Sequence, residues 1–128
     1  PVDTTRPAAE QAAAVYRDGR FAECNDAFAR MYGYDAAADI LGRGLAATLP
    51  PDLPGAADFL AAGIAAGYRV TDAESEERDR HGNPVYFSNS LTGVVEGGKL
   101  VRVWGTQRDI TDRKRAEAAL RASEERYR

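Results

Sequence analysis

Hydrophobic and polar residues alternate along the second half of the chain in the way that half-buried β-strands require. The alternating segments are rich in β-branched and aromatic residues, and glycine-containing turns separate them. This pattern predicts three antiparallel strands that follow one another as a meander. The strands are expected at residues 70–80, 85–95 and 100–108, and the turns at residues 80–83 and 96–98.

The N-terminal part carries two different signals. Thr5, followed by Arg6-Pro7 and the alanine-rich residues 8–14, indicates either a helix or a frayed tail. Asp18-Gly19 then stands between two β-prone segments, Val15-Tyr16 and Phe21–Cys24. An Asp-Gly pair in this setting predicts a hairpin, because the tight turn needs positive φ.

Helical patterns occupy the middle of the chain. Asn25-Asp26 is typical of a helix cap, and glycines after each short segment indicate where helices end. Leu60, Ile64 and Tyr68 recur every four residues, which places them on one helix face. Strands grouped around short helices favour an α+β fold with one antiparallel sheet. The helices are expected at residues 26–32, 36–41 and 56–68, with a proline-rich loop at residues 50–55.

The C-terminal tail has a heptad-like stripe. Ala116, Leu120, Ser123 and Tyr127 follow one another at steps of four, three and four residues. The stripe covers about two heptad repeats and is typical of a short coiled coil, although a solvated helix end is equally compatible with it.

Composition narrows the function classes. The 128 residues carry a net charge of −3, one cysteine and one histidine. These numbers exclude a global basic field for nucleic acid, a disulfide framework and a multi-cysteine zinc site, and no apolar run is long enough for a membrane span. We therefore expect a soluble cytoplasmic domain with no metal and no nucleic-acid partner. A small α+β isomerase with Glu77 or Asp79 as base is an alternative, but no nucleophile–base pair supports catalysis.

Four separate stretches carry a family resemblance. They are Phe21–Phe28 with Met31–Tyr34, the turn Asp39–Arg43, the hairpin Asp79–Asn83 and the segment Gln107–Lys114. In this order and spacing they resemble a PAS domain with its terminal PAC motif, the sensor module of bacterial signalling proteins. Ser123–Arg128 resembles the segment that opens another such domain.

The resemblance implies an organisation of the chain. Residues 1–14 would form an N-terminal cap or helix, residues 15–112 the PAS domain, and residues 113–128 a signalling helix that leads to a further domain. The fold implied is a five-stranded antiparallel sheet with short helices over one face, which enclose a small cavity, plus helical extensions at both ends.

The resemblance also implies a function. Such modules sense a small molecule or partner, form homodimers and pass their state through the C-terminal helix to a covalently linked output domain. A two-component histidine kinase or a diguanylate cyclase is a common output. An unliganded interaction and dimerisation linker is the alternative, as is a domain that captures a protein partner through Trp104.

Two known cofactors are disfavoured. Flavin photosensors carry a reactive cysteine where this chain has Leu45, after Gly42-Arg43-Gly44, so a cysteinyl-flavin adduct is excluded at that position. Cys24 is more typical of a small buried hydrophobe than of a reactive thiol. Haem-binding relatives ligate through a histidine on the long helix, but residues 56–68 contain none, and His81 lies in a turn. The identity of any ligand stays unknown.

Strand parity predicts which side chains share a face. Val103 and Gln107 lie on one face of the last strand, and Trp104 lies on the other. By resemblance to the flavin-binding relatives, the Gln107 face points inward, where Glu77 and Asn89 would join it in a polar cluster. This cluster would hold a ligand, or its members would hydrogen-bond one another, and Glu77 could instead lie at the rim. The expected cavity residues are Phe28, Leu45, Leu60, Ile64, Glu77, Phe87, Asn89, Leu91, Val103 and Gln107.

Two further sites follow from the same strand. Trp104 and Tyr86 would form an outer face that a second subunit or the N-terminal helix covers. Asp109, Ile110 and Thr111 stand where the last strand becomes the exit helix, and a short polar side chain there would fix the exit angle. We expect these three residues to couple the sheet to the helix.

Overall fold

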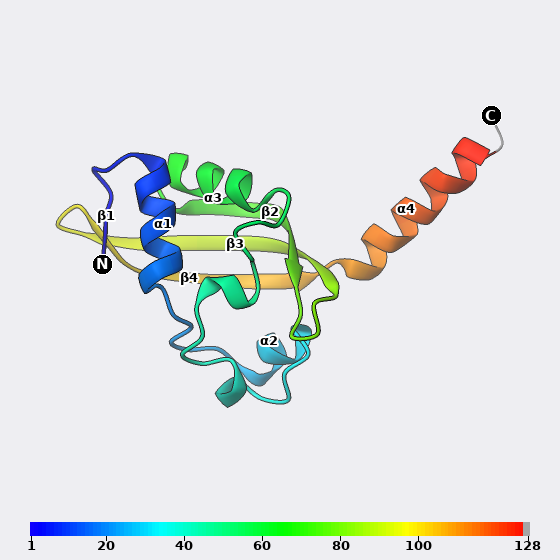
Figure 1. Ribbon diagram of the computed structural model, residues 1–128, viewed down its shortest axis with the longest axis horizontal. Helices are drawn as coiled ribbons and strands as arrows, with labels where there is room; N and C mark the ends of the chain where they lie inside the picture. Colours follow the sequence, from blue (N-terminus) through cyan, green and yellow to red (C-terminus); the bar gives the residue numbers. More distant parts are fainter. Residues whose placement is uncertain (127–128) are drawn as a thin grey trace.

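An antiparallel meander forms the sheet, as the alternating pattern predicts. The computed structural model describes residues 1–126, and within them the sheet has four strands in the order β1-β4-β3-β2 (Figure 1). Strand β4 pairs with β3 over most of its length, and β3 pairs in turn with β2. The strands are β1 (Val2–Asp3), β2 (Arg69–Arg78), β3 (Pro84–Glu96) and β4 (Lys99–Asp109).

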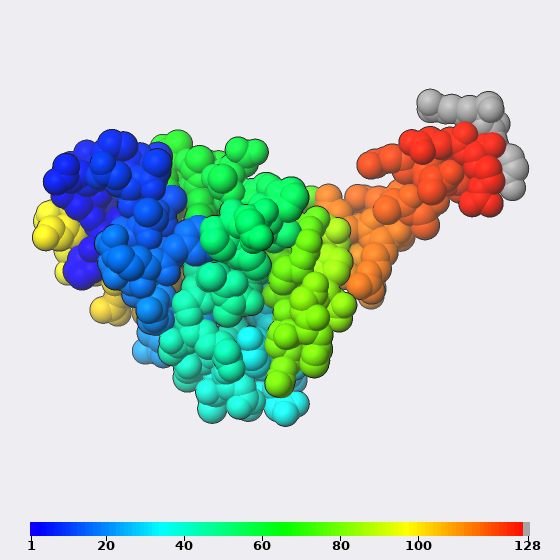
Figure 2. All heavy atoms as spheres, viewed as in Figure 1, coloured from blue at the N-terminus to red at the C-terminus, as the bar shows by residue number. Residues whose placement is uncertain are grey.

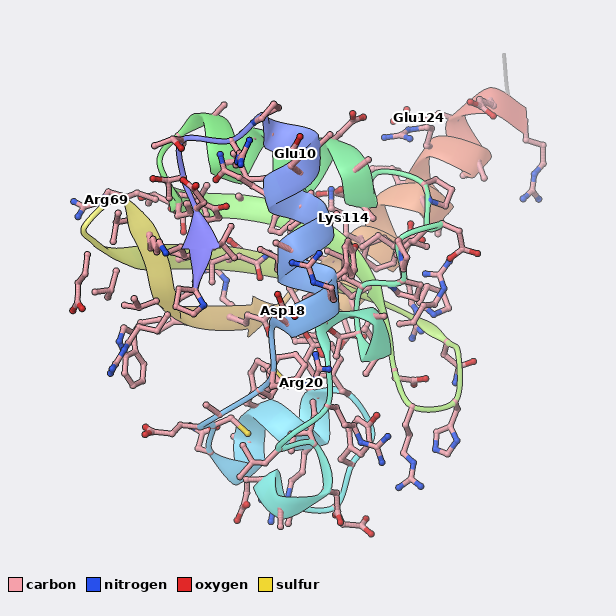
Figure 3. The ribbon with its side chains drawn as sticks, turned by 60° about the vertical axis from the view of Figure 1, so that its left-hand side comes forward. Glu10, Asp18, Arg20, Arg69, Lys114 and Glu124 are labelled. Carbon is pink, nitrogen blue, oxygen red and sulfur yellow. The ribbon has the colours of Figure 1, made fainter. Side chains whose placement is uncertain are left out.

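The expected N-terminal hairpin is wrong, and with it the expected fifth strand. Helix α1 (Ala8–Asp18) continues through Val15-Tyr16, and Figure 3 shows Asp18 at its end. Gly19 has φ −68°, so no positive-φ turn forms there. The alanine-rich run propagates the helix, and the Tyr16 hydroxyl anchors it by donating to the Leu49 carbonyl oxygen at 2.8 Å. Phe21 exchanges backbone hydrogen bonds with Gly42 and Arg43 instead of joining the sheet.

The three helices expected in the middle of the chain form where the sequence predicts them, and one short 3₁₀ turn, Leu45–Ala47, was not predicted. The Asn25 side chain accepts from the Phe28 N–H and caps the helix that follows. Gly33 and Gly42 both take positive φ, as residues that end a helix often do. The last expected helix in the middle of the chain ends earlier than predicted, before Tyr68. The helices are α2 (Asp26–Met31), the short 3₁₀ turns η1 (Ala37–Asp39) and η2 (Leu45–Ala47), α3 (Ala56–Ala65) and α4 (Thr111–Arg126).

The helices before β2 cover one face of the sheet, which we call the inner face. Tyr68 lies opposite Gly93 on this face and donates through its hydroxyl to Gln11 of α1 at 2.7 Å. Two clusters of buried hydrophobic residues form the core. The first core cluster comprises Ala29, Tyr32, Tyr34, Ile40 and Phe87, and the second core cluster comprises Leu49, Leu53 and Ala56.

Helix α4 leaves the body of the domain. Figure 1 shows it following the end of β4, and Figure 2 shows it projecting from the domain. Only its first turns approach the sheet, where they contact β3 and β2. Its C-terminal half is exposed throughout residues 120–126 except at Ser123. Among the helices of residues 1–126, none has the length and apolar character that crossing a membrane would need.

Candidate functional site

The predicted polar residues meet on the inner face. Asn89 pairs directly with Gln107 on β4 and with Ala73 on β2, so their side chains share a face of the sheet. Glu77 is four residues beyond Ala73 on the same face, and it is 4% exposed, so it does not lie at the rim. The structure therefore brings Glu77, Asn89 and Gln107 together, as strand parity and the family resemblance together predict.

These side chains are hydrogen-bonded to one another. Gln107 Nε2 donates to Asn89 Oδ1 at 2.7 Å and to Glu77 Oε2 at 3.3 Å. Asn89 Nδ2 donates to the Ala73 carbonyl oxygen and to Ser75 Oγ, both at 2.9 Å. Ser75 Oγ in turn donates to Glu77 Oε2 at 2.8 Å. Three strands are thereby linked through side chains, in addition to their backbone pairing.

Tyr32, at the end of α2, completes the arrangement. Its hydroxyl oxygen lies 2.9 Å from Glu77 Oε1 and 2.9 Å from Gln107 Oε1. The ring is 1% exposed and packs against Phe28 and Phe87, with centroid distances of 5.2 and 4.9 Å. We call the five residues Tyr32, Ser75, Glu77, Asn89 and Gln107 the inner polar cluster.

Burial sets the electrostatics of the inner polar cluster. Burial raises the pKa of Glu77 above its ordinary value, although the hydrogen bonds from Ser75 and Tyr32 act in the opposite direction. Burial also raises the pKa of Tyr32 well above its ordinary value, and the nearby Glu77 adds to this effect. Both groups are therefore biased toward their neutral forms.

The other expected cavity residues divide between the two core clusters. Phe28 and Phe87 surround Tyr32 in the first core cluster, while Leu45 and Leu60 pack against the second. Ile64 is half-buried on α3, and Leu91 is half-buried beside Gly105. Val103 is exposed, so its side chain is open to solvent. That these residues line one ligand cavity stays a prediction.

The exit of the chain from β4 is fixed by side chains that the sequence singles out. Asp109 Oδ1 accepts from the Thr111 N–H at 2.8 Å, and Thr111 Oγ1 accepts from the Tyr86 N–H at 3.0 Å. The Ile110 N–H donates to the Tyr86 carbonyl oxygen at 2.8 Å. The start of α4 is thus held against β3 by two hydrogen bonds, and a third joins it to the end of β4.

An ion-pair group secures the first turn of α4 to β2. The Glu74 carboxylate pairs with Arg113 at 2.6 Å and with Lys114 at 2.5 Å. Figure 3 places Lys114 near the body of the domain and Glu124 at the far part of the helix. Glu74 is half-exposed, so solvent screens these pairs.

The outer face of the sheet carries Trp104. It is 48% exposed, and the guanidinium of Arg102 lies 5.9 Å from its ring. Tyr86 is half-buried near the start of α4. Within this chain α1 does not cover Trp104, because α1 packs against α3 and β1 on the inner face.

The residues weighed for cofactor chemistry lie apart from the inner polar cluster. Cys24 is half-buried between the first core cluster and solvent, and burial raises the pKa of its thiol, with the Asp26 carboxylate adding to the effect. His81 is exposed in the β2–β3 turn, where its backbone N–H donates to Asp79 Oδ1 at 2.8 Å. Asp79 serves as the acceptor that shapes this turn.

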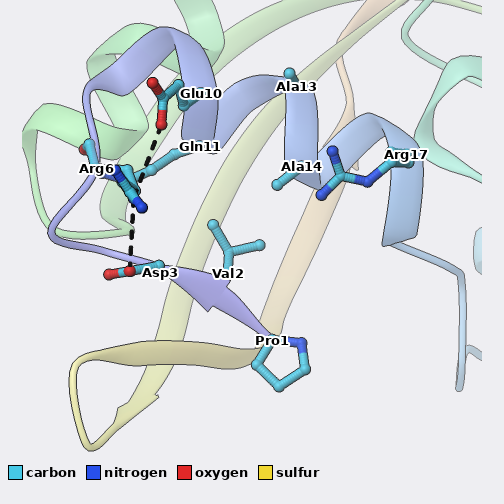
Figure 4. Close-up of a pocket in the computed structure, with 9 residues that line it drawn as sticks. All are labelled: Pro1, Val2, Asp3, Arg6, Glu10, Gln11, Ala13, Ala14 and Arg17. Atoms are coloured by element: carbon cyan, nitrogen blue, oxygen red, sulfur yellow. Dashed lines mark hydrogen bonds and ion pairs between the residues drawn. The ribbon is translucent and has the colours of Figure 1, made fainter.

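An open groove of about 440 Å³ runs between β1 and α1. Figure 4 shows Arg6 between Asp3 and Glu10, with ion pairs of 3.9 and 4.0 Å. Arg17, at the other end of the groove, pairs with Asp18 at 2.9 Å. Because these arginines are already paired with carboxylates of the same chain, neither offers an anion an unpaired guanidinium.

The comparison with protein families agrees with this architecture. A family model described as PAS domain matches residues 12–112. The chain therefore belongs to the PAS domain family, whose members are sensory and interaction modules and are generally non-catalytic. A search of curated proteins found no match to this chain.

Proposed function

We propose that this chain is a signal-relay module in which the state of the inner polar cluster passes through β4 to α4 and on to a following output domain. The observation that carries the proposal is the continuity of residues 107–111. Gln107 belongs to the inner polar cluster, and Asp109 and Thr111 fix the start of α4. A change at Gln107 is therefore two residues from the side chains that orient the exit helix.

Relay without a resident small molecule is favoured over ligand sensing. Tyr32 fills the space beside the three strands, and no buried side-chain nitrogen or oxygen in residues 1–126 lacks a hydrogen-bond partner. Buried polar groups that satisfy one another do not need a ligand for that purpose. Native mass spectrometry of the purified protein tests this point, because an added mass from a retained small molecule would contradict relay without ligand.

The inner polar cluster is poorly suited to catalysis. Glu77 and Tyr32 pair as an isomerase would require, but both side chains are buried, and the Glu77 carboxyl is hydrogen-bonded to Ser75 and Gln107. A substrate would have to displace these partners before it could reach the carboxyl. We therefore propose a non-catalytic cytoplasmic module whose output lies in another domain, such as a histidine kinase or a diguanylate cyclase.

Loss of the Thr111 hydroxyl is expected to uncouple α4 from the sheet. Thr111→Val removes the acceptor of the part-buried Tyr86 N–H and should cost about 1 kcal/mol of stability. In the full-length protein it should also change the output of the domain that follows α4, and an output assay with and without the stimulus measures this. Thr111→Ser keeps the hydroxyl and serves as the matched control. If the Thr111→Val variant gives the same output as the wild type, with and without the stimulus, Thr111 has no part in the relay.

The proposed module acts as a homodimer through α4. The 16-residue helix projects from the domain, whereas helices in proteins gain most of their stability by packing an apolar face against a partner. Leu120, a member of the heptad-like stripe, is 61% exposed. A second α4 would cover this stripe as in a short coiled coil. Tyr127, the last member of the stripe, lies outside the described residues.

We expect Leu120→Glu to weaken self-association by at least about tenfold, because it places a charge in the apolar seam, and about 1.4 kcal/mol suffices for that change. Sedimentation velocity over a concentration series measures the effect. Ala118→Glu introduces the same charge on the opposite side of α4 and should leave association unchanged. If Leu120→Glu and Ala118→Glu associate equally, the dimer contact does not involve the stripe on α4. The outer face around Trp104 and Tyr86 is then the next surface to test.

A further inference from the structure

The hydroxyl of Tyr32 stands between two acceptors. Its oxygen lies 2.9 Å from Glu77 Oε1 and 2.9 Å from Gln107 Oε1. A phenol carries one proton, whereas an ionised carboxylate and an amide oxygen only accept. If Glu77 is ionised, one of the two contacts therefore has no hydrogen in it and brings two lone pairs together.

The orientation of the two amides is fixed by the backbone, which removes the usual ambiguity between amide oxygen and nitrogen. The Ala73 carbonyl oxygen only accepts, so the Asn89 group that faces it at 2.9 Å is Nδ2. Asn89 Oδ1 then faces Gln107 and requires a donor, which is Gln107 Nε2 at 2.7 Å. Gln107 consequently presents Oε1 to Tyr32, and turning its amide would set two oxygens against each other.

We infer that the inner polar cluster is a proton-binding site, in which Glu77 is a neutral carboxylic acid that donates from Oε1 to the Tyr32 hydroxyl while Tyr32 donates to Gln107 Oε1. With this one added proton, each contact within the cluster has a single hydrogen. The remaining Glu77 oxygen, Oε2, accepts from Ser75 and Gln107. The ligand of the site is a proton exchanged with solvent.

Release of the proton changes the link between the inner polar cluster and β4. The ionised Glu77 carboxylate attracts the single Tyr32 hydrogen, because hydrogen bonds to a charged acceptor are the stronger ones. Gln107 Oε1 then loses its donor, and the connection from Tyr32 to the last strand is broken. This step deepens the proposed function and rests on it for its signalling consequence, since Gln107 is continuous with the residues that orient α4.

The surroundings of Glu77 agree with a neutral carboxyl. It is faced by hydroxyls of Ser75, Tyr32 and Thr48 and by the Gln107 amide. Tyr16 of α1 is a further titratable group near it. Across residues 1–126 no lysine or arginine forms an ion pair with its carboxylate, and the Arg78 guanidinium reaches only its backbone oxygen at 3.2 Å.

The pH dependence follows from the direction of the shift. Burial raises the pKa of Glu77 in the folded state, so its contribution to stability is complete below the ordinary pKa of a glutamate. That contribution is lost as the pH rises through the raised pKa, because the ionised form is disfavoured in the folded protein. Glu77→Gln should remove this loss, since its amide donates to Tyr32 as the carboxylic acid does.

The test is a pH titration of the side-chain carboxyl ¹³C resonances of the whole chain by NMR. Glu77 is expected to titrate above the ordinary range of a glutamate side chain, and the Gln107 side-chain and Ile110 amide resonances should follow the Glu77 midpoint. In parallel, unfolding at several pH values should show the loss of stability with rising pH in the wild type and in Glu76→Gln, the control on the same strand, but not in Glu77→Gln.

Two results would overturn the inference. Titration of Glu77 in the ordinary range of a glutamate side chain would show an ordinary ionised carboxylate. Gln107 and Ile110 resonances that do not change at the Glu77 midpoint would remove the link to β4. The NMR titration uses the wild-type protein, so it tests the proton-binding site even if Glu77→Gln does not fold. Either result leaves the Thr111→Val output test intact, so failure of the proton site is distinguishable from failure of the relay.

Discussion

Asn89→Asp is expected to lower the free energy of unfolding by about 3 to 5 kcal/mol, the range found when a buried charge is left uncompensated. Asn89 is 1% exposed, and its amide nitrogen donates to the Ala73 carbonyl oxygen and to Ser75. A carboxylate at this position would face the carbonyl oxygen without a hydrogen between them. Chemical denaturation at constant pH measures the loss.

The matched control for this substitution is Asn25→Asp. It makes the same chemical change at the exposed cap of α2, where the side chain accepts from the Phe28 N–H at 2.8 Å. Aspartate caps helices about as well as asparagine, so the change in stability there should be small. A similarly small effect at both positions would show that Asn89 is not locked in the inner polar cluster.

Tyr32→Phe is expected to lower the free energy of unfolding by about 2 to 6 kcal/mol, because two buried groups lose a partner and each such loss costs about 1 to 3 kcal/mol. The groups are Glu77 and Gln107, both 2.9 Å from the hydroxyl oxygen. The ring contacts with Phe28 and Phe87 remain, so the loss reports on the hydroxyl. Thermal and chemical unfolding measure it.

Tyr34→Phe is the control for the loss of a buried tyrosine hydroxyl. Tyr34 belongs to the same core cluster, but its ring is contacted by the guanidinium groups of Arg43 and Arg80, and these contacts do not need the hydroxyl. Removal of the Tyr34 hydroxyl should change the free energy of unfolding by less than about 0.5 kcal/mol. Equal losses from the two variants would argue that the Tyr32 hydroxyl has no special role.

Strand parity predicted which sheet residues share a face, because it depends only on local geometry, while the resemblance to PAS domains implied which face points inward. Side chains on a strand alternate between two faces, so the spacing within β4 places Gln107 once its neighbours are placed. Glu77 and Asn89 followed in the same way from β2 and β3, and the pairing of Asn89 with Gln107 agrees. Ser75, two residues before Glu77, could have been found by the same rule.

Tyr32 could not be assigned to the site from the sequence. Its spacing from Phe28 is that of an ordinary helix packing residue, and its ring does pack against Phe28 and Phe87. The contacts of its hydroxyl depend on where the end of α2 lies over the sheet, 45 residues from Glu77 and 75 from Gln107 along the chain. No local pattern encodes a contact of that kind.

The wrong prediction at Asp18-Gly19 came from a competition between two local signals. The Asp-Gly pair favours a tight turn, but the alanine-rich run before it favours continued helix, and Tyr16 is held in that helix by its bond to Leu49. The helix prevails through Asp18, and the two strand candidates on either side are lost from the sheet. Tertiary contacts of α1 with α3 and β1 support this outcome.

Amide hydrogen exchange at the start of α4 tests the relay most directly. The amides to follow are Tyr86 and Ile110, which bond to Thr111 Oγ1 and to the Tyr86 carbonyl oxygen. Tyr32→Phe is compared with Leu49→Ala, a variant of the second core cluster chosen for a similar loss of global stability. The relay predicts that Tyr32→Phe speeds exchange at these two amides beyond its global loss of stability, and that Leu49→Ala does not. Equal acceleration in both variants would contradict a connection from the inner polar cluster to α4.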